Sequence, residues 1–130
     1  MIGIVIVAHG GLAAEYLAAV EHVLGRQDGM RAIKIGAECD RDAKTAEIKD
    51  AADSVDRGEG VVVVVDMFGG SPSNLSIPAC LAQDRHILFG ANLPMLVKLV
   101  QSRHRPIHDA VARAEDAGRK YLSSYNPAPR

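Results

Sequence analysis

Two apolar runs decide the fold: residues 2–8, which read IGIVIVA, and residues 61–65, which read VVVVV. Most of their side chains are β-branched, and a continuous run of this kind is typical of a strand buried on both faces of a parallel sheet. A glycine-rich loop follows each run, HGG at residues 9–11 and DMFGGS at residues 66–71. We therefore predict two central strands that each end in a glycine-rich loop.

The other segments alternate between helical and strand-like patterns. We expect Asp42 and Ser71 to be the N-caps of two helices. Pro72 would be the first helical residue after Ser71. Pro78 should bend that helix, because proline has no N–H to donate. The expected helices cover residues 12–24, 42–55, 92–100 and 107–117, and one more helix begins at Ser71. Two further strands are expected over residues 30–35 and 86–90.

This alternation predicts an α/β fold with a doubly wound, four-stranded parallel sheet and helices on both faces. A strand order of 2-1-3-4 would place the first and third strands side by side. The chain has no internal repeat and no linker-like stretch. We therefore expect a single domain over residues 1–130, with residues 126–130 as a frayed tail.

Composition narrows the classes of function. The chain has 130 residues, 48% of them hydrophobic, and a formal net charge of −1. This balance predicts neither nucleic-acid binding nor attraction to anionic lipid. Residues 1–8 are apolar but are too short and lack the basic region expected of a signal peptide, and no apolar run approaches the roughly 20 residues that a membrane-spanning helix needs. We expect a cytoplasmic protein in which Cys39 and Cys80 are free thiols.

The carboxyl ends of the two central strands are the predicted position of the active site. In an open α/β sheet, ligands bind in the crevice at the carboxyl ends of neighbouring strands whose connections leave in opposite directions. His9 and Asp66 would face each other there. A carboxylate that accepts the Nδ1–H of an imidazole fixes its tautomer and leaves Nε2 as a nucleophile.

The loops around this pair favour an anion as ligand. Both are rich in glycine and lead into helix N-termini, where free N–H groups and the helix dipole attract phosphate. Gly10, Gly11, Gly70 and Ser71 are the candidate phosphate-binding residues. Together with a nucleophile and an orienting acid, they are the parts required for phosphoryl transfer to a histidine.

These residues also have simpler interpretations. A lone histidine after a strand is more often a structural hydrogen-bonding group, and Asn92 is more simply a helix N-cap. We expect no metal at His9, because zinc needs three or four ligands and Asp66 is the single candidate ligand expected beside it. We expect no cofactor, and we interpret the remaining histidines as surface or hydrogen-bonded residues: His22, His86, His104 and His108.

Three segments together resemble a known family: VIVAHG at residues 5–10, DMFGGSPSN at residues 66–74 and GANLPML at residues 90–96. They are similar, in the same order, to the mannose-type enzyme IIA of the bacterial phosphoenolpyruvate-dependent sugar phosphotransferase system. The resemblance implies that His9 is phosphorylated by the histidine-containing phosphocarrier protein and that Asp66 assists. It also implies the 2-1-3-4 sheet, with an antiparallel edge strand exchanged between two subunits. Residues 119–125 are the candidate for that strand.

The same resemblance implies the partners. Many mannose-type proteins carry a IIB domain on the same chain, and we expect the next acceptor here to be a IIB protein on a separate chain. A homodimer is expected, with membrane contact only indirectly through a transporter complex. Two other functions stay open: a regulatory reporter of phosphorylation state that binds a partner protein without feeding a transporter, and a small-molecule-binding module without phosphoryl transfer.

Overall fold

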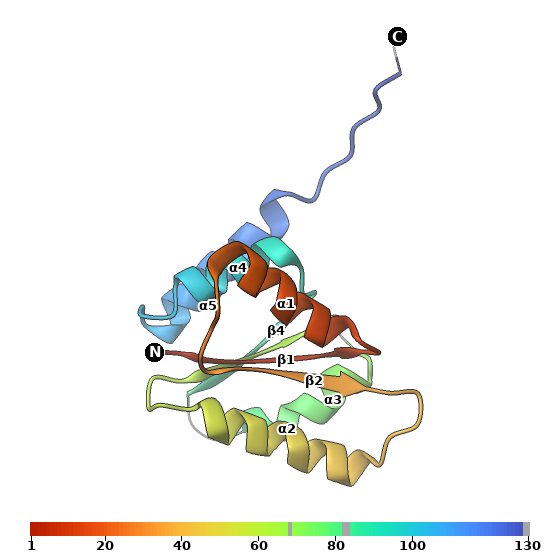
Figure 1. The fold of residues 1–130 in the computed structure, drawn as a ribbon, viewed down its shortest axis with the longest axis vertical. Helices are drawn as coiled ribbons and strands as arrows, with labels where there is room; N and C mark the ends of the chain where they lie inside the picture. Colours follow the sequence, from red (N-terminus) through yellow and green to blue (C-terminus); the bar gives the residue numbers. More distant parts are fainter. Residues whose placement is uncertain (68, 82–83, 129–130) are drawn as a thin grey trace.

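The computed structural model describes residues 1–67, 69–81 and 84–128. Its centre is a sheet of four parallel strands in the order β2-β1-β3-β4, which confirms the predicted topology (Figure 1). In the register, Val5 pairs with Val63 of β3 and with Arg31 of β2. The strands are β1 (Gly3–His9), β2 (Met30–Ile35), β3 (Val61–Val65) and β4 (Arg85–Phe89).

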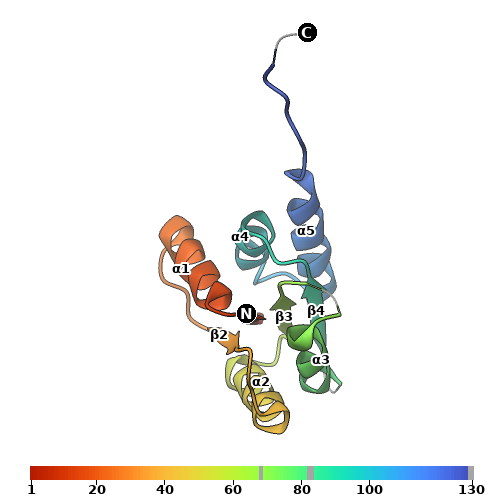
Figure 2. The same ribbon diagram turned by 90° about the vertical axis from the view of Figure 1, so that its right-hand side faces the viewer.

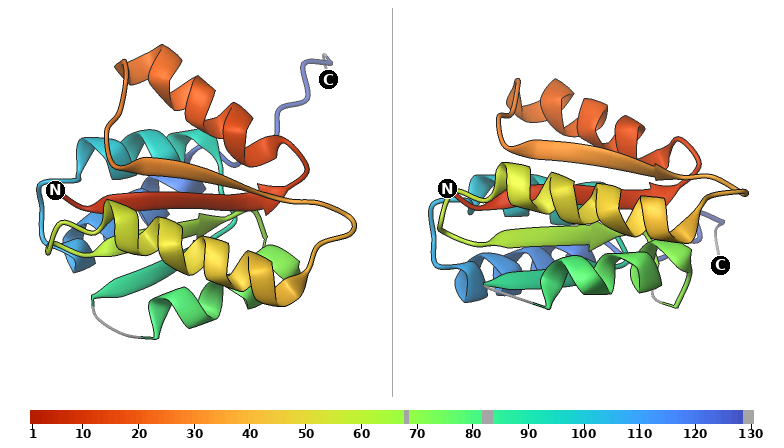
Figure 3. Two further views of the ribbon diagram at one scale, coloured as in Figure 1. Left: turned by 60° about the horizontal axis from the view of Figure 1, so that its bottom comes forward. Right: turned by 90° about the horizontal axis from the view of Figure 1, so that it is seen from below.

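Helices cover both faces of the sheet, as predicted (Figure 2). One face carries α1 (Leu12–Leu24), α4 (Leu93–Gln101) and α5 (Ile107–Lys120). The other carries α2 (Arg41–Val55), α3 (Ser71–Ser76) and a 3₁₀-helix (Ile77–Cys80), and these lie in front of the sheet in the two views of Figure 3.

Alternate residues of the central strands enter two separate cores. Ile4 and Ile6 of β1 pack in the core under α1, α4 and α5, whereas Val5 and Val7 pack in the core under α2 and α3. All four side chains are fully buried. This burial on both faces explains why β1 is a continuous apolar run instead of an alternating pattern.

Two predicted N-caps are wrong by one or two residues. The cap of α2 is Asp40, whose carboxylate accepts the N–H of Ala43 at 3.1 Å, so Asp42 lies inside the first turn. Ser71 is the first residue of α3, and Gly70 is its cap without a side-chain hydrogen bond. An extended ψ of −179° at Gly70 turns the chain into the helix one residue earlier than predicted.

Two further differences concern helix ends. Around Pro78 the chain continues as a 3₁₀-helix, because proline cannot donate the N–H that an α-helix requires. The last helix continues past Gly118 to Lys120. Gly118 serves close packing there, since a Cβ at this position would lie 3.1 Å from the Cβ of Met95 in α4.

The chain after α5 runs away from the rest of the molecule (Figure 1). No strand forms among described residues 121–128. The large side chains of this segment are exposed, at 86% for both Leu122 and Tyr125. Residues 129–130 of the expected frayed tail lie outside the described residues, as does Phe68 of the second glycine-rich loop. None of the helices in the described part of the chain has the length and apolar character required to span a bilayer.

Candidate active site

His9 is the last residue of β1, at the carboxyl end of the sheet. The chain turns directly after it, because Gly10 adopts a positive φ of 55° and α1 begins two residues later. The N–H of Gly10 donates to the carbonyl oxygen of Ile35 at 3.0 Å, which ties the turn to the end of β2. The imidazole of His9 is 48% exposed, so it stands at the surface.

Asp66 follows β3 and meets His9, as the predicted strand order requires. Its Oδ2 lies 2.7 Å from Nδ1 of His9 and also accepts the backbone N–H of His9 at 3.0 Å. Its Oδ1 accepts the backbone N–H of Met67 at 3.0 Å. With both oxygens held, the carboxylate, which is only 11% exposed, has a fixed orientation toward the ring.

This pairing decides where the imidazole carries its proton. Burial raises the pKa of Asp66, but the hydrogen bonds from the backbone and ring of His9, the charge of His9 and the N–H of Met67 together hold it below its ordinary value. Asp66 is therefore a carboxylate at neutral pH and can only accept a hydrogen bond. Nδ1 of a neutral His9 must then carry the proton, which leaves the lone pair of Nε2 available for reaction.

The second glycine-rich loop lies against the same ring. A Cβ at Gly70 would stand 3.3 Å from Cε1 and 3.6 Å from Nε2 of His9. Among the described residues, the N–H groups of Gly11, Gly70 and Ser71 have no hydrogen-bond acceptor, whereas that of Gly10 is already bonded. The fold therefore brings Gly70 next to His9, and it removes the N–H of Gly10 from the set that could hold an anion.

Tyr16 of α1 is a neighbour of the site that the sequence motifs do not single out. Its hydroxyl donates to the carbonyl oxygen of Ala91, in the loop after β4, at 3.0 Å. Burial and then the negative charge of Asp66 raise the pKa of Tyr16. The tyrosine links α1 to the loop after β4.

Asn92 has the role of a helix cap, as predicted. Its Oδ1 accepts the N–H of Met95 at 3.0 Å, and its Nδ2 donates to the carbonyl of Gly118 at 3.3 Å. Asn92 therefore caps α4 with its Oδ1 and joins the start of α4 to α5 with its Nδ2. Of the other histidines, His22 is exposed on α1, while His86 and His108 contact each other elsewhere in the fold.

Comparison with known proteins assigns the chain to a family. The family model of EIIA-man, described as the fructose IIA component of the phosphotransferase system (PTS), matches residues 3–115. The chain is 28% identical over 131 residues to the mannose-specific EIIAB component of the PTS of Escherichia coli K12. That alignment covers 98% of this chain and 41% of the relative, so the chain spans about two fifths of its length.

Solved structures show the same fold. The phosphotransferase system component EIIA of Streptococcus agalactiae has a TM-score of 0.80 and 26% identity, over 95% of this chain and 97% of that one. The mannose/sorbose-specific IIA subunit of Enterococcus faecalis has a TM-score of 0.86 at 18% identity, over 99% and 98% of the two chains. The chain therefore belongs to the EIIA-man family, the IIA components of the sugar phosphotransferase system.

Proposed function

We propose that this chain is a phosphoryl carrier in which Nε2 of His9 accepts a phosphoryl group from the histidine-containing phosphocarrier protein. The group then passes to a IIB component, the part named beside IIA in the Escherichia coli relative. The observation that carries this proposal is the 2.7 Å contact between Nδ1 of His9 and Oδ2 of Asp66. It leaves Nε2 nucleophilic on an imidazole exposed enough for a partner protein to reach.

The transfer exchanges one P–N bond for another. The lone pair of Nε2 of His9 attacks the phosphorus atom of the donor's phosphohistidine, and the bond from phosphorus to the donor nitrogen breaks. The proton on Nδ1 stays in place. As the imidazole of His9 gains positive character, the carboxylate of Asp66 stabilises it, which is the task of the acid in a catalytic triad. Transfer to the acceptor is the reverse of this step.

The phosphoryl group on Nε2 would lie beside Gly70. We propose that the N–H groups of Gly11, Gly70 and Ser71 bind its oxygens, with the N-terminus of α1 adding a favourable dipole. Gly10 contributes its backbone conformation, since its N–H is bonded to Ile35. No metal or other cofactor has a part in this scheme, and the protein would act in the cytoplasm.

We also propose a homodimer built through the C-terminal segment. β4 is one of the two edge strands of the sheet, and the segment after α5 leaves the molecule with Leu122 and Tyr125 exposed. An open strand edge and an extended apolar segment can pair between two copies of one chain. Light scattering at micromolar concentration tests this, and a monomeric mass would contradict it.

Labelling from phosphoenolpyruvate tests the main proposal. The chain is incubated with enzyme I and the phosphocarrier protein, and its intact mass is measured for wild type, His9→Ala and Ser71→Ala. A phosphohistidine is a phosphoramidate, so the adduct should be lost in acid and persist in alkali. Because His22 is an exposed histidine on α1, His22→Ala is the matched control.

The expected result is acid-labile label on wild type, Ser71→Ala and His22→Ala, and none on His9→Ala. Label that survives in His9→Ala, or its absence from wild type, would refute the proposal. Transfer to IIB is a separate measurement, in which the labelled chain is mixed with a purified IIB component and loss of label is followed. If the label stays on the chain in this mixture, the proposal that IIB is the acceptor is refuted, whereas the proposal that His9 is phosphorylated is unaffected.

A further inference from the structure

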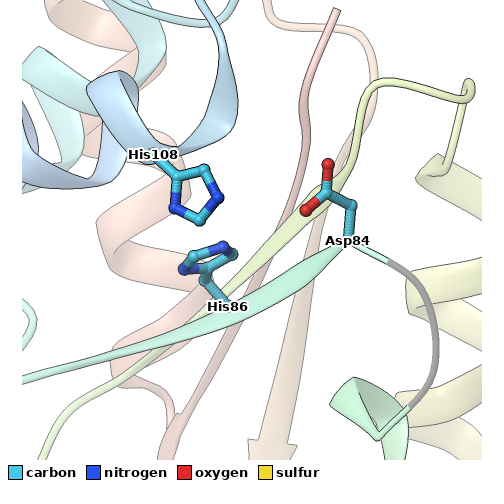
Figure 4. A group of neighbouring side chains, drawn as sticks. All are labelled: Asp84, His86 and His108. Atoms are coloured by element: carbon cyan, nitrogen blue, oxygen red, sulfur yellow. The ribbon is translucent and has the colours of Figure 1, made fainter.

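Three potential metal ligands meet at the amino end of β4. His9 lies at the other end of the sheet, where the strands have their carboxyl ends. Asp84 directly precedes β4, His86 is its second residue, and His108 is the second residue of α5. One ligand atom from each of them lies within 4.8 Å of the other two. Figure 4 shows the carboxylate of Asp84 directed toward the two imidazole rings.

The fold explains why these residues converge. Asp84 lies in the bend that leads into β4, where its carbonyl oxygen accepts the N–H of Val61, and its side chain reaches the same side of the sheet as that of His86, two positions further on. It is the face that α5 covers, since Leu88 of β4 and Ile107 of α5 share one core cluster. His108 follows Ile107, and its ring meets that of His86 edge-on, with the ring centroids 5.0 Å apart and the planes at 83°.

These ligand atoms are not used by the rest of the described structure. Across residues 1–67, 69–81 and 84–128, the three side chains make no hydrogen bond and no ion pair. The charges beside them are already compensated. Arg105 pairs with Asp109 at 3.3 Å, and Glu59 pairs with the amino group of Met1. Arg105 therefore does not need Asp84, and Glu59 is an anion that cannot pair with it, so the carboxylate of Asp84 is available to a cation.

We propose that Asp84, His86 and His108 form a binding site for a divalent transition-metal ion of the zinc class. Two imidazoles and one carboxylate are a ligand set that zinc uses with an open fourth position, whereas calcium and magnesium prefer oxygen alone. Ligand atoms around tetrahedral zinc lie about 3.3 Å apart. The three groups must therefore close by up to about 1.5 Å, which side-chain rotation achieves because Asp84 and His108 are exposed.

A metal ion here would join α5 to the start of β4. These two elements are linked at this point by apolar contacts of Ile107, and a shared ion adds three bonds that the unfolded chain cannot form. The site does not involve His9 or Asp66, which lie at the carboxyl end of the strands. The proposed metal site is thus independent of phosphoryl transfer and is tested separately.

Zinc binding by the untagged, chelator-treated chain tests the site, with Zn²⁺ alone as the probe in isothermal titration. His108→Ala and Asp84→Asn remove ligands at exposed positions, so the fold should persist, and thermal unfolding in chelator checks this. His104→Ala is the matched control, because His104 lines the same depression as Asp84 and His108 without belonging to the cluster. His9→Ala controls for binding at the active site.

We expect wild type, His104→Ala and His9→Ala to bind one Zn²⁺ per chain. His108→Ala and Asp84→Asn should lose at least about tenfold in affinity, since loss of even an outer-shell partner of a metal site costs that much. Zn²⁺ should raise the Tm of wild type and leave that of His108→Ala unchanged. No binding by wild type, equal binding by His108→Ala, or a loss confined to His104→Ala or His9→Ala would overturn the proposal.

Discussion

Replacing Asp66 by asparagine tests how the carboxylate controls His9. Asp66 accepts three N–H groups: the Nδ1–H and backbone N–H of His9 at Oδ2, and the N–H of Met67 at Oδ1. An asparagine amide keeps the shape but has one NH₂ group, which cannot accept. In either orientation of the amide, the NH₂ group faces an N–H donor, of His9 at the Oδ2 position or of Met67 at the Oδ1 position. With the NH₂ at the Oδ2 position, Nδ1 must accept and the proton moves to Nε2, so the nucleophile is lost.

The magnitude follows from the lost charge. A hydrogen bond to a charged group contributes about 1.5–3 kcal/mol. Since each 1.36 kcal/mol of barrier is a factor of ten in rate, its loss slows transfer by about 10- to 150-fold. In a serine-protease triad the same change costs about 10⁴-fold. Because His9 is 48% exposed and water screens part of its charge, we expect about a hundredfold here.

The assay is a rapid-quench time course of phosphorylation by the phosphorylated carrier protein, followed by intact mass. Asp50→Asn is the matched control, because Asp50 is an exposed aspartate on α2. Thermal unfolding shows whether Asp66→Asn is folded. A folded Asp66→Asn protein that is phosphorylated as fast as the control would refute the role of the carboxylate and leave Asp66 as a loop residue.

Three further predictions concern pH and glycine. The folded-state pKa of Asp66 lies below its unfolded value of about 3.9, so its contribution to the unfolding free energy is fully present above that pH. The advantage of wild type over Asp66→Asn in urea unfolding should therefore shrink between pH 5 and pH 3, and a constant difference would contradict it. Gly70→Ala should slow phosphorylation with little change in Tm, because its Cβ would stand 3.3 Å from the histidine ring, whereas Gly11→Ala, whose Cβ meets nothing within 4 Å, should keep the wild-type rate. Gly3→Ala should destabilise the fold by about 1–3 kcal/mol in chemical denaturation, since its Cβ would lie 2.6 Å from Cγ2 of buried Val55.

The central part of the fold and of the site was predictable because it depends on regular rules. Two β-branched runs predict buried parallel strands, and adjacent parallel strands bring their carboxyl ends together. The contact between His9 and Asp66 follows from these two statements without any knowledge of side-chain conformation. The resemblance to the mannose-type IIA family agrees with this pattern, and the match of the family model over residues 3–115 confirms it.

Details that depend on single-residue register could not be predicted in this way. Gly10 was a candidate phosphate-binding residue, but its N–H bonds to Ile35, and that bond is fixed by the pairing of His9 with Ile35 at the end of β2. Ser71 was expected to be a cap and is the first helical residue. A hydrophobic pattern places an element to within a residue or two, whereas the partner of an N–H group changes with every residue.

The cluster of Asp84, His86 and His108 shows a different limit. Asp84 and His86 are close in sequence, but two candidate ligands do not define a metal site. The third ligand comes from α5, beyond the whole of α4, and only the packing of Ile107 against the face of β4 sets its position. That position depends on how far α5 reaches along the sheet, a quantity that no local pattern encodes. A site at the carboxyl end of parallel strands is inherent in the topology, whereas one at the amino end exists only if helix and strand lengths happen to match.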